Sequence, residues 1–351
     1  MKVLGAYRDN AAGYYRIVAP FSVLRYRTEH ELDVQRPSVA AADEYDVLWL
    51  QQHASPVAEI VAREFKARGK LVIYDVDDWL FGLPASWPCY GHYFERGTGK
   101  PTDRLHFHER LLRLADVVTC PTEPLAEALR EWLGSGQVIR VLPNCIIQGE
   151  WDTVIPAEHN RDGPVLGWFG TGNHWDDWYE IVLAVDLALE AVGGYLALIG
   201  APELVTMFPE RLAARTLVHP LVPMKRFHET RRLIAAFDVG LAWCTDRLTS
   251  NRYRSPLKAI QYGAAGVPVV ASRTVYGDLS DFCPTHGVTV SRPGALAGAL
   301  TYALSRGLPD AQERVAAWQG EVWRSHSYET QAMRWLGVLE EAWERSGATG
   351  D

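Results

Sequence analysis

The chain has 351 residues, of which 48% are hydrophobic and 22% charged, and its formal net charge is −8 at pH 7. This length suits two domains of ordinary size or one large one, and an aromatic share of 11% excludes a disordered or low-complexity chain. The acidic balance argues against a nucleic-acid coat or a polybasic membrane binder.

Short apolar runs alternate with amphipathic segments of helix length in the first part of the chain. The expected strands are Val3–Tyr7, Asp46–Leu50, Leu71–Tyr74, Val117–Thr119 and Val138–Leu142. The expected helices between them include Pro56–Arg68, Arg104–Leu114 and Glu123–Leu133. This alternation predicts βαβ units and a parallel sheet with helices on both faces.

The alternation stops in a polar, turn-rich stretch between Pro143 and Pro164 and then starts again. The second set of strands is Val165–Phe169, Tyr195–Ile199, Thr216–His219, Val239–Trp243, Val267–Ala271 and Val288–Val290. The second set of helices is Trp178–Ala191, Met224–Phe237, Pro256–Ala265, Pro293–Ser305, Gln312–Trp323 and Tyr328–Arg345.

We therefore predict an α/β protein with two doubly wound domains that face each other across a cleft. The expected division is a first domain over 1–150, a linker over 151–163, a second domain over 164–325, and a C-terminal helix and tail over 326–351. Ligands of open α/β sheets bind outside the carboxyl ends of the strands, so the cleft is the expected site.

No segment of the sequence indicates secretion, membrane insertion or a disulfide framework. Arg8 and Asp9 interrupt the N-terminus too early for a signal peptide, and no run of about 18 apolar residues occurs. The five cysteines are widely spaced without a C-x-x-C pair, which is typical of buried reduced thiols. We expect a cytoplasmic protein without a transmembrane segment, and attachment to a membrane face stays open.

The most informative motif is Ser255–Ser272, with the sequence S-P-L-K-A-I-Q-Y-G-A-A-G-V-P-V-V-A-S. It predicts a helix with Ser255 as N-cap and Pro256 in the first position. Four cations converge on its start, which favours an anion site at the helix N-terminus: Arg247, Arg252, Arg254 and Lys258. The alternative is a solvated basic turn before an ordinary βα unit.

A glycine loop, Gly170–Asp177, follows the first strand of the second domain and has the sequence G-T-G-N-H-W-D-D. Such a loop lets a phosphate approach the backbone closely. Position 175 is Trp where a dinucleotide fingerprint has its third glycine, so a dinucleotide site is poorly supported. The expected phosphate-side residues are Gly170, Thr171, Gly172, Asn173 and His174, and a capping role for His174 is the alternative.

The stretch Phe237–Ser272 closely resembles the donor-site segment of GT-B fold glycosyltransferases of the group-1, family-4 retaining type. Further segments resemble this family in the same order along the chain: Gly13–Pro20, Val72–Phe81, Ala115–Ala126, Val141–Ile146 and Tyr328–Trp343. The resemblance implies two Rossmann-like domains, the first for the acceptor and the second for the donor. It also implies that the terminal helix crosses back to the first domain.

The resemblance also implies roles for particular residues. A nucleotide-diphospho-sugar would be held by the glycine loop and by Asn251, Arg254, Ser255, Pro256, Leu257 and Gln261. Gln261 stands where the family has a ribose-binding glutamate; its amide can still hydrogen-bond hydroxyl groups but carries no charge. Lys258 and Arg252 would stabilise the leaving diphosphate.

On the acceptor side, the expected residues are Asn10, Gly13, Tyr14 and Arg16, in a loop that leads to a helix starting near Tyr14. Arg16 either reaches the cleft or pairs with an acid at the surface. Asp77 or Asp78, in the acidic stretch Asp75–Asp78, would orient the acceptor hydroxyl or act as its base. Two alternatives are a Mg²⁺ or Mn²⁺ site of the D-x-D type found in the GT-A fold, and acids that only cap a turn. A second doubly wound half argues against GT-A.

The implied activity is a hexosyl transfer from a UDP- or GDP-sugar to an acceptor hydroxyl, with retention of configuration and without an obligatory metal or other cofactor. A glycan, a lipid-linked sugar, a protein, a small molecule and a hydroxylated nucleic-acid base all stay open as acceptors. Two alternatives keep the fold: a nucleotide-sugar epimerase, and a non-catalytic nucleotide-sugar-binding protein, which Gln261 and the lack of the family's usual arginine–lysine pair favour.

Overall fold

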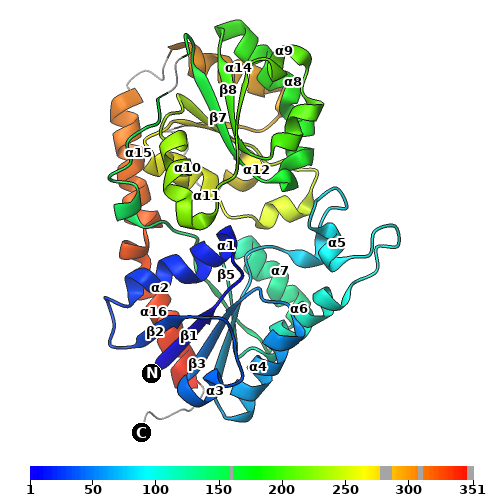
Figure 1. Ribbon diagram of the computed structural model, residues 1–351, viewed down its shortest axis with the longest axis vertical. Coiled ribbons are helices and arrows are strands. Elements are labelled where there is room, and N and C mark those ends of the chain that lie inside the picture. Colours follow the sequence, from blue (N-terminus) through cyan, green and yellow to red (C-terminus); the bar gives the residue numbers. More distant parts are fainter. Residues whose placement is uncertain (159–160, 277–286, 307–310, 346–351) are drawn as a thin grey trace.

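The computed structural model describes residues 1–158, 161–276, 287–306 and 311–345. These residues form two α/β domains that lie end to end, each built on a parallel sheet with helices packed against it (Figure 1). The expected pair of doubly wound domains is therefore confirmed.

The sheet of the N-terminal domain has the strand order β2-β1-β3-β4-β5-β6, and each pair of neighbours is parallel. Its strands are β1 (Lys2–Ala6), β2 (Glu31–Val34), β3 (Val47–Gln51), β4 (Leu71–Asp75), β5 (Val117–Cys120) and β6 (Val138–Val141). The edge strand β2 was not expected, because it is short and follows a polar turn that hides its pattern.

The helices of this domain have recognisable starts and stops. They are α1 (Ala11–Gly13), a π-helix (Tyr14–Val18), α2 (Ala19–Leu24), α3 (Ala41–Glu44), α4 (Pro56–Ala67), α5 (Tyr90–Tyr93), α6 (Asp103–Leu114) and α7 (Glu123–Leu133). Ser55 caps α4 by accepting the amide of Ala58 at 3.1 Å. The first helix begins at Ala11, three residues before the expected start, because the Asn10 side chain caps it.

The C-terminal domain repeats the design with the strand order β12-β11-β10-β7-β8-β9. Its strands are β7 (Val165–Gly170), β8 (Tyr195–Gly200), β9 (Thr216–His219), β10 (Val239–Ala242), β11 (Val269–Ser272) and β12 (Gly287–Val290). Its helices are α8 (Trp175–Val192), α9 (Glu210–Ala213), α10 (Phe227–Ile234), α11 (Leu257–Ala264), α12 (Arg273–Tyr276), α14 (Pro293–Arg306) and α15 (Ala311–His326).

The chain crosses between the domains twice, and the two crossings lie side by side. The amide of Ile146 donates to the carbonyl of His326 at 3.0 Å, and the amide of Tyr328 donates to the carbonyl of Ile146 at 2.9 Å. The last helix, α16 (Tyr328–Arg345), returns to the N-terminal domain, where Trp335 stacks on Trp49 of β3 (Figure 1). The expected return of the terminal helix is confirmed.

Each domain has its own core, and large aromatic side chains fill much of it. Trp168 and Trp178 are 1% and 0% exposed in the core of the C-terminal domain, so both serve packing. Among the described cysteines, Cys120, Cys145 and Cys244 are buried free thiols and Cys89 is a half-buried one; Cys283 lies outside the described residues.

Candidate functional site

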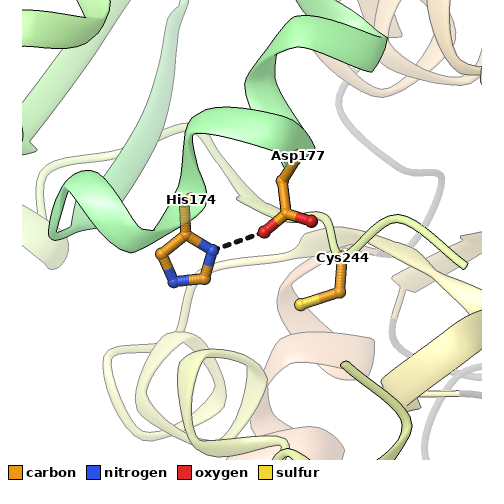
Figure 2. A group of neighbouring side chains, drawn as sticks. All are labelled: His174, Asp177 and Cys244. Carbon is orange, nitrogen blue, oxygen red and sulfur yellow. Dashed lines mark hydrogen bonds and ion pairs between the residues drawn. The ribbon is translucent and has the colours of Figure 1, made fainter. Parts of the chain in front are cut away.

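A buried polar cluster lies at the carboxyl ends of the strands in the C-terminal domain. His174 ends a short 3-10 helix (Gly172–His174) after β7, and Asp177 stands in the first turn of α8. Nδ1 of His174 lies 2.7 Å from Oδ2 of Asp177, and Cys244, which follows β10, completes the group (Figure 2). His174 and Asp177 are both buried, so their contact is shielded from water.

Asp177 anchors this cluster because it accepts several hydrogen bonds at once. Its Oδ1 accepts from the amide of Thr245 at 2.7 Å and from Nδ2 of Asn251 at 2.9 Å. Burial alone would raise the pKa of Asp177, but the His174 ring and Arg254 outweigh it and hold the pKa below its ordinary value. A stable carboxylate therefore fixes both the His174 ring and the loop after β10.

Two cationic side chains converge on the His174 ring from the segment before and inside α11. Nζ of Lys258 lies 2.8 Å from Nε2 of His174, and Nη1 of Arg254 lies 3.1 Å from Nδ1. Burial, together with these two charges, lowers the pKa of His174 to about 3. The ring is therefore neutral at pH 7, and Nε2 accepts from Lys258 in the tautomer that donates from Nδ1 to Asp177.

Burial also lowers the pKa of Lys258 to about 8. The ammonium group therefore keeps its charge at pH 7, although its desolvation destabilises the charged form. The ammonium group lies beside aromatic rings, with Nζ 5.7 Å from the ring centre of Trp168 and 5.8 Å from that of Phe169. A partly buried ammonium and guanidinium that share one neutral imidazole have excess positive charge. This arrangement can bind an anion such as a diphosphate.

His174, Asp177 and Cys244 also offer three ligand atoms within 4.8 Å of one another, the minimum for a metal ion (Figure 2). Lys258 and Arg254 contact the same imidazole, so a divalent cation there would face two positive charges. Burial raises the pKa of the Cys244 thiol to about 11, which keeps it protonated and a poor ligand. The geometry therefore favours an anion over a cation at this place.

The helix α11 begins at Leu257, and the expected cap by Ser255 is wrong. Pro256 occupies the N-cap position without a side-chain hydrogen bond. Oγ of Ser255 is buried and finds no hydrogen-bond partner in the described part of the chain. The hydroxyl is therefore free to bind a group that approaches the α11 N-terminus.

The structure separates the four cations of this segment. Arg254 and Lys258 meet at His174, whereas Arg252 is exposed and Arg247 lies 3.3 Å from Glu180. Asn251 is fully buried and uses its amide hydrogens on Asp177 and on the carbonyl of Thr245. Asn251 thus positions the loop, and only Arg254 and Lys258 form the cationic pair.

At Gly172 the glycine loop is in close contact with other parts of the protein chain. A side chain at Gly172 would meet Oε1 of Glu203 at 2.3 Å and Pro88 of the N-terminal domain at 3.3 Å. Thr171 is exposed and Asn173 half-buried. Glycine at 172 therefore lets the N-terminal domain approach the start of α8.

Gln261 lies inside the interface between the domains. It is 2% exposed, and its amide Nε2 donates to the hydroxyl of Tyr15 in the π-helix. Gln261, which occupies the sequence position of the family's ribose-binding glutamate, is thus hydrogen-bonded to the N-terminal domain. A ribose at this place would have to share Gln261 with Tyr15.

In the N-terminal domain, Arg16 is completely buried, and its partner Asp75 stands at the end of β4. Its Nη2 lies 2.6 Å from Oδ2 of Asp75, and its Nη1 donates to Oδ1 of Asn144 at 3.0 Å. The expectation of a surface salt bridge is wrong, because both Arg16 and Asp75 are 0% exposed. Arg16 holds other residues in place and does not line the cleft.

Asn144, which accepts from Arg16, also positions Asp77, because its Nδ2 donates to Oδ1 of Asp77 at 3.1 Å. Burial and the neighbouring Asp78 raise the pKa of Asp77 to about 7, although Arg16 and Asn144 act in the opposite direction. A carboxyl group with this pKa, held by an amide at the carboxyl end of a strand, is suited to accept a proton near neutral pH.

The remaining acceptor-side residues shape the loop after β1. Oδ1 of Asn10 accepts the amide of Gly13 at 2.8 Å, and a Cβ on Gly13 would lie 2.1 Å from the carbonyl oxygen of Arg8. Tyr14 donates its hydroxyl to Glu150 at 2.5 Å, and Glu150 also pairs with Arg231 of the C-terminal domain. Tyr14 thus joins the domains.

A long connection between β4 and α6 reaches from the N-terminal domain to the cationic pair. We call residues 79–94 the bridging segment. The guanidinium carbon of Arg254 lies 4.5 Å from the ring centre of Trp87, and Ser86 hydrogen-bonds Asp176 at 2.5 Å. Figure 1 shows α5 of this segment beside the C-terminal domain. Arg254 of the cationic pair is therefore covered by an aromatic ring from the other domain.

Asp177 and Asn144 were not among the expected site residues. Asp177 could have been noticed as the second acid in the first turn of α8, next to His174. Asn144 lies in a matched segment, but nothing in its local pattern shows that it faces Asp77. Trp87 reaches the site across the interface, and no local signal in the sequence records such a contact.

No protein-family profile and no curated protein sequence matches this chain. Solved structures do match it over nearly its whole length. Sucrose-phosphate synthase from Thermosynechococcus elongatus is 15% identical, with 98% of this chain and 99% of that chain covered and a TM-score of 0.67. Anabaena HepE in complex with UDP is 15% identical, with 97% and 100% covered and a TM-score of 0.66.

A putative UDP-N-acetylglucosamine 2-epimerase from Listeria monocytogenes is also similar, at 14% identity, with 98% and 97% covered and a TM-score of 0.56. At these identities the similarity concerns the fold, and it confirms the predicted GT-B architecture. In the described residues, no helix is both long and apolar enough to span a membrane.

Proposed function

We propose that this protein is a glycosyltransferase that moves a sugar from a nucleotide-diphospho-sugar to an acceptor hydroxyl. The observation that carries the proposal is the convergence of Arg254 and Lys258 on the buried His174 beside the α11 N-terminus. This cationic pair lies at the carboxyl ends of the C-terminal strands, where open α/β sheets bind ligands. The GT-B fold and the neighbour with bound UDP support this class of donor.

The chemical task is to stabilise the negative charge that grows on the leaving diphosphate. Lys258 is already oriented by Nε2 of His174, and Nη1 of Arg254 lies 3.8 Å from Oδ2 of Asp177, so little reorganisation is needed when the charge develops. The free hydroxyl of Ser255 and the amide groups at the start of α11 add further donors. We assign the diphosphate to this group and the sugar to the cleft beyond it.

The acceptor enters from the N-terminal domain in this proposal. Asp77 orients its hydroxyl and takes up its proton, because a carboxyl group with a pKa of about 7 is partly ionised at neutral pH. We extend the proposal to retention of configuration and to transfer without an obligatory metal, as the sequence resemblance to family 4 implies. The excess positive charge near His174 agrees with a metal-independent donor site.

A thermal-shift screen of nucleotide-diphospho-sugars tests the proposal and identifies the donor. A ligand that binds only the folded protein raises the unfolding midpoint. At a ligand concentration of 100 times the dissociation constant, the free energy of unfolding rises by about 2.7 kcal/mol. We expect one UDP- or GDP-sugar to raise the midpoint in the native chain and much less in a Lys258→Met variant. No shift with any nucleotide sugar would contradict the proposal.

The similarity to the Listeria protein keeps an epimerase as the second candidate. The two reactions differ in what they consume. Incubation with the donor alone yields a new nucleotide sugar if the protein is an epimerase, whereas a transferase leaves the donor unchanged or hydrolyses it slowly. Product analysis by mass and NMR spectroscopy separates these outcomes.

A further inference from the structure

A second pocket lies on the N-terminal domain, apart from the cationic pair. Its volume is about 710 Å³, within the range of about 300–1,000 Å³ that is usual for small-molecule sites. Its walls are the segments that follow three neighbouring strands: Tyr7 and Arg8 after β1, Arg36 after β2, and His53 and Ser55 after β3. It therefore lies at the carboxyl edge of the sheet, where the strand order reverses around β1.

The polar lining of this pocket favours an anion. Arg8 and Arg36 line it, and Asp9 is the acid among its lining residues. The 12-residue helix α4 begins at its wall, directly after the cap Ser55, so the positive end of this helix lies at the pocket. Two arginines and a helix N-terminus together offer the positive charge and the hydrogen-bond donors that bind a phosphate group.

His53 adds a neutral polar group to the same wall. Burial lowers its pKa, and the charges of Arg8 and Arg104 lower it further, so the ring is uncharged near neutral pH. Its Nδ1 is buried and has no hydrogen-bond partner within the described ranges. A neutral imidazole with one free nitrogen is suited to bind a hydroxyl group that stands next to the anion.

The pocket is connected to the acid that we propose as the base. The residue before His53 is Gln52, whose Oε1 accepts the amide of Asp77 at 3.4 Å. Gln52 has φ of 41°, which a residue with a side chain rarely adopts and which often marks a functional site. The backbone turn at Gln52 therefore places the pocket wall next to Asp77.

The pocket is also connected to the donor side through the bridging segment. Nη1 of Arg8 donates to the hydroxyl of Tyr93 at 3.0 Å, and Tyr93 belongs to the same segment as Trp87, which covers Arg254. One short piece of chain thus contacts a cation of each site. While these contacts are closed, the segment positions the two sites relative to each other, as transfer between them requires.

We infer that this pocket binds the acceptor and selects a small hydroxylated molecule that carries a phosphate group. Arg8, Arg36 and the N-terminus of α4 bind the phosphate, and His53 binds a hydroxyl. The inference rests on the proposed function, which provides the donor, and it names the class of acceptor that the proposed function leaves open.

Calorimetry on the full chain tests the inference with defined probes. The titrations use glycerol 3-phosphate against glycerol, glucose 6-phosphate against glucose, and glucuronate as the carboxylate. A saturating concentration of UDP or GDP, whichever binds the native chain, fills the donor site first, because that site also binds phosphates. We expect at least one phosphate to bind tenfold or more tightly than its parent polyol and than glucuronate.

Variants locate the binding. Arg36→Gln removes an exposed pocket cation, and Arg8→Gln removes the one that Tyr93 holds. Each should weaken the phosphate probe by about tenfold to a hundredfold, as expected for a charge-assisted contact. The matched control Arg27→Gln loses one exposed arginine outside the pocket and should bind like the native chain.

The outcomes separate the two proposals. If neither UDP nor GDP binds the native chain, the proposed function fails, whatever the phosphate probes do. If one of them binds but neither phosphate is preferred over its polyol, or glucuronate binds as well as the phosphates, the inference about this pocket fails. If Arg8→Gln also lowers the affinity for the nucleotide, the effect of that variant is not specific to this pocket, and Arg36→Gln is the test that counts. An unchanged affinity of Arg36→Gln for the phosphate probe would overturn the inference.

Discussion

Replacing Lys258 by methionine would remove one positive charge from the proposed diphosphate site and keep most of the side chain. The ammonium group lies 2.8 Å from Nε2 of His174 and beside the rings of Trp168 and Phe169. Methionine is flexible and of similar length, and its thioether packs well against aromatic rings, so it can occupy the same space without the charge. The substitution therefore tests the charge and leaves the packing largely unchanged.

The expected loss of turnover follows from the role of a preorganised donor. Removal of one such group costs about 10²–10³ in kcat, or about 2.7–4 kcal/mol. Arg254 stays in place, so some activity should survive. The expected effect on stability has the opposite sign. A pKa lowered from 10.5 to about 8 means that folding disfavours the charged ammonium by on the order of 3 kcal/mol at pH 7. The variant should therefore unfold at the same temperature as the native protein or at a higher one.

The assay measures turnover at saturating donor together with the thermal midpoint. Lys225→Met is the matched control, because Lys225 is an exposed lysine in a 3-10 helix of the same domain. It should change turnover less than twofold. Near-native turnover in Lys258→Met would refute the reasoning. A loss of turnover with a lower midpoint would also refute it, since Lys258 would then act by supporting the fold.

Three further predictions concern pH and two residues at the domain interface. The profile of kcat/KM against pH should be bell-shaped, because Asp77 is protonated below about pH 7 and Lys258 loses its charge above about pH 8. Lys258→Arg should move the alkaline limb to higher pH. A profile that is flat from pH 6 to 9 would contradict both roles. Gln261→Glu should keep the contact with the Tyr15 hydroxyl and strengthen nucleotide-sugar binding up to about tenfold in calorimetry; weaker binding would exclude a ribose contact. Trp87→Ala should lower the free energy of unfolding in urea by about 3–5 kcal/mol, with Trp87→Phe as the milder control, and a smaller loss would mean that the ring over Arg254 packs loosely.

The repeating pattern of strands and helices could be predicted because it is local. Buried strands such as Val117–Cys120 are short apolar runs, and α7 has a threonine cap and an amphipathic face. The edge strand β2 was missed because its four residues include two acids and bury mainly Leu32. The start of the first helix was misplaced because the cap at Asn10 precedes a π-helix, which has no simple periodic pattern.

The candidate site was predictable in part, and the limit is the interface between the domains. Lys258 and Arg254 belong to one motif, so the sequence alone could place them near a helix start. Their meeting with His174 depends on two loops at neighbouring strand ends, which the fold class implies but a motif does not. The cover by Trp87 comes from the other domain, and the fully buried state of Arg16 depends on Asp75, 59 residues away along the chain.

The positions of the interdomain contacts bear on how a donor could enter. The two crossings of the chain lie side by side at Ile146 and Ser327, so they form one hinge. In Figure 1 the bridging segment with α5 lies on the opposite side of the molecule from α15, which leads into that hinge. A rotation about the hinge therefore moves the contact between Trp87 and Arg254 farther than any contact near Ile146. We expect this contact to separate first when the cleft opens, so the cationic pair becomes accessible at the same step that frees Trp87.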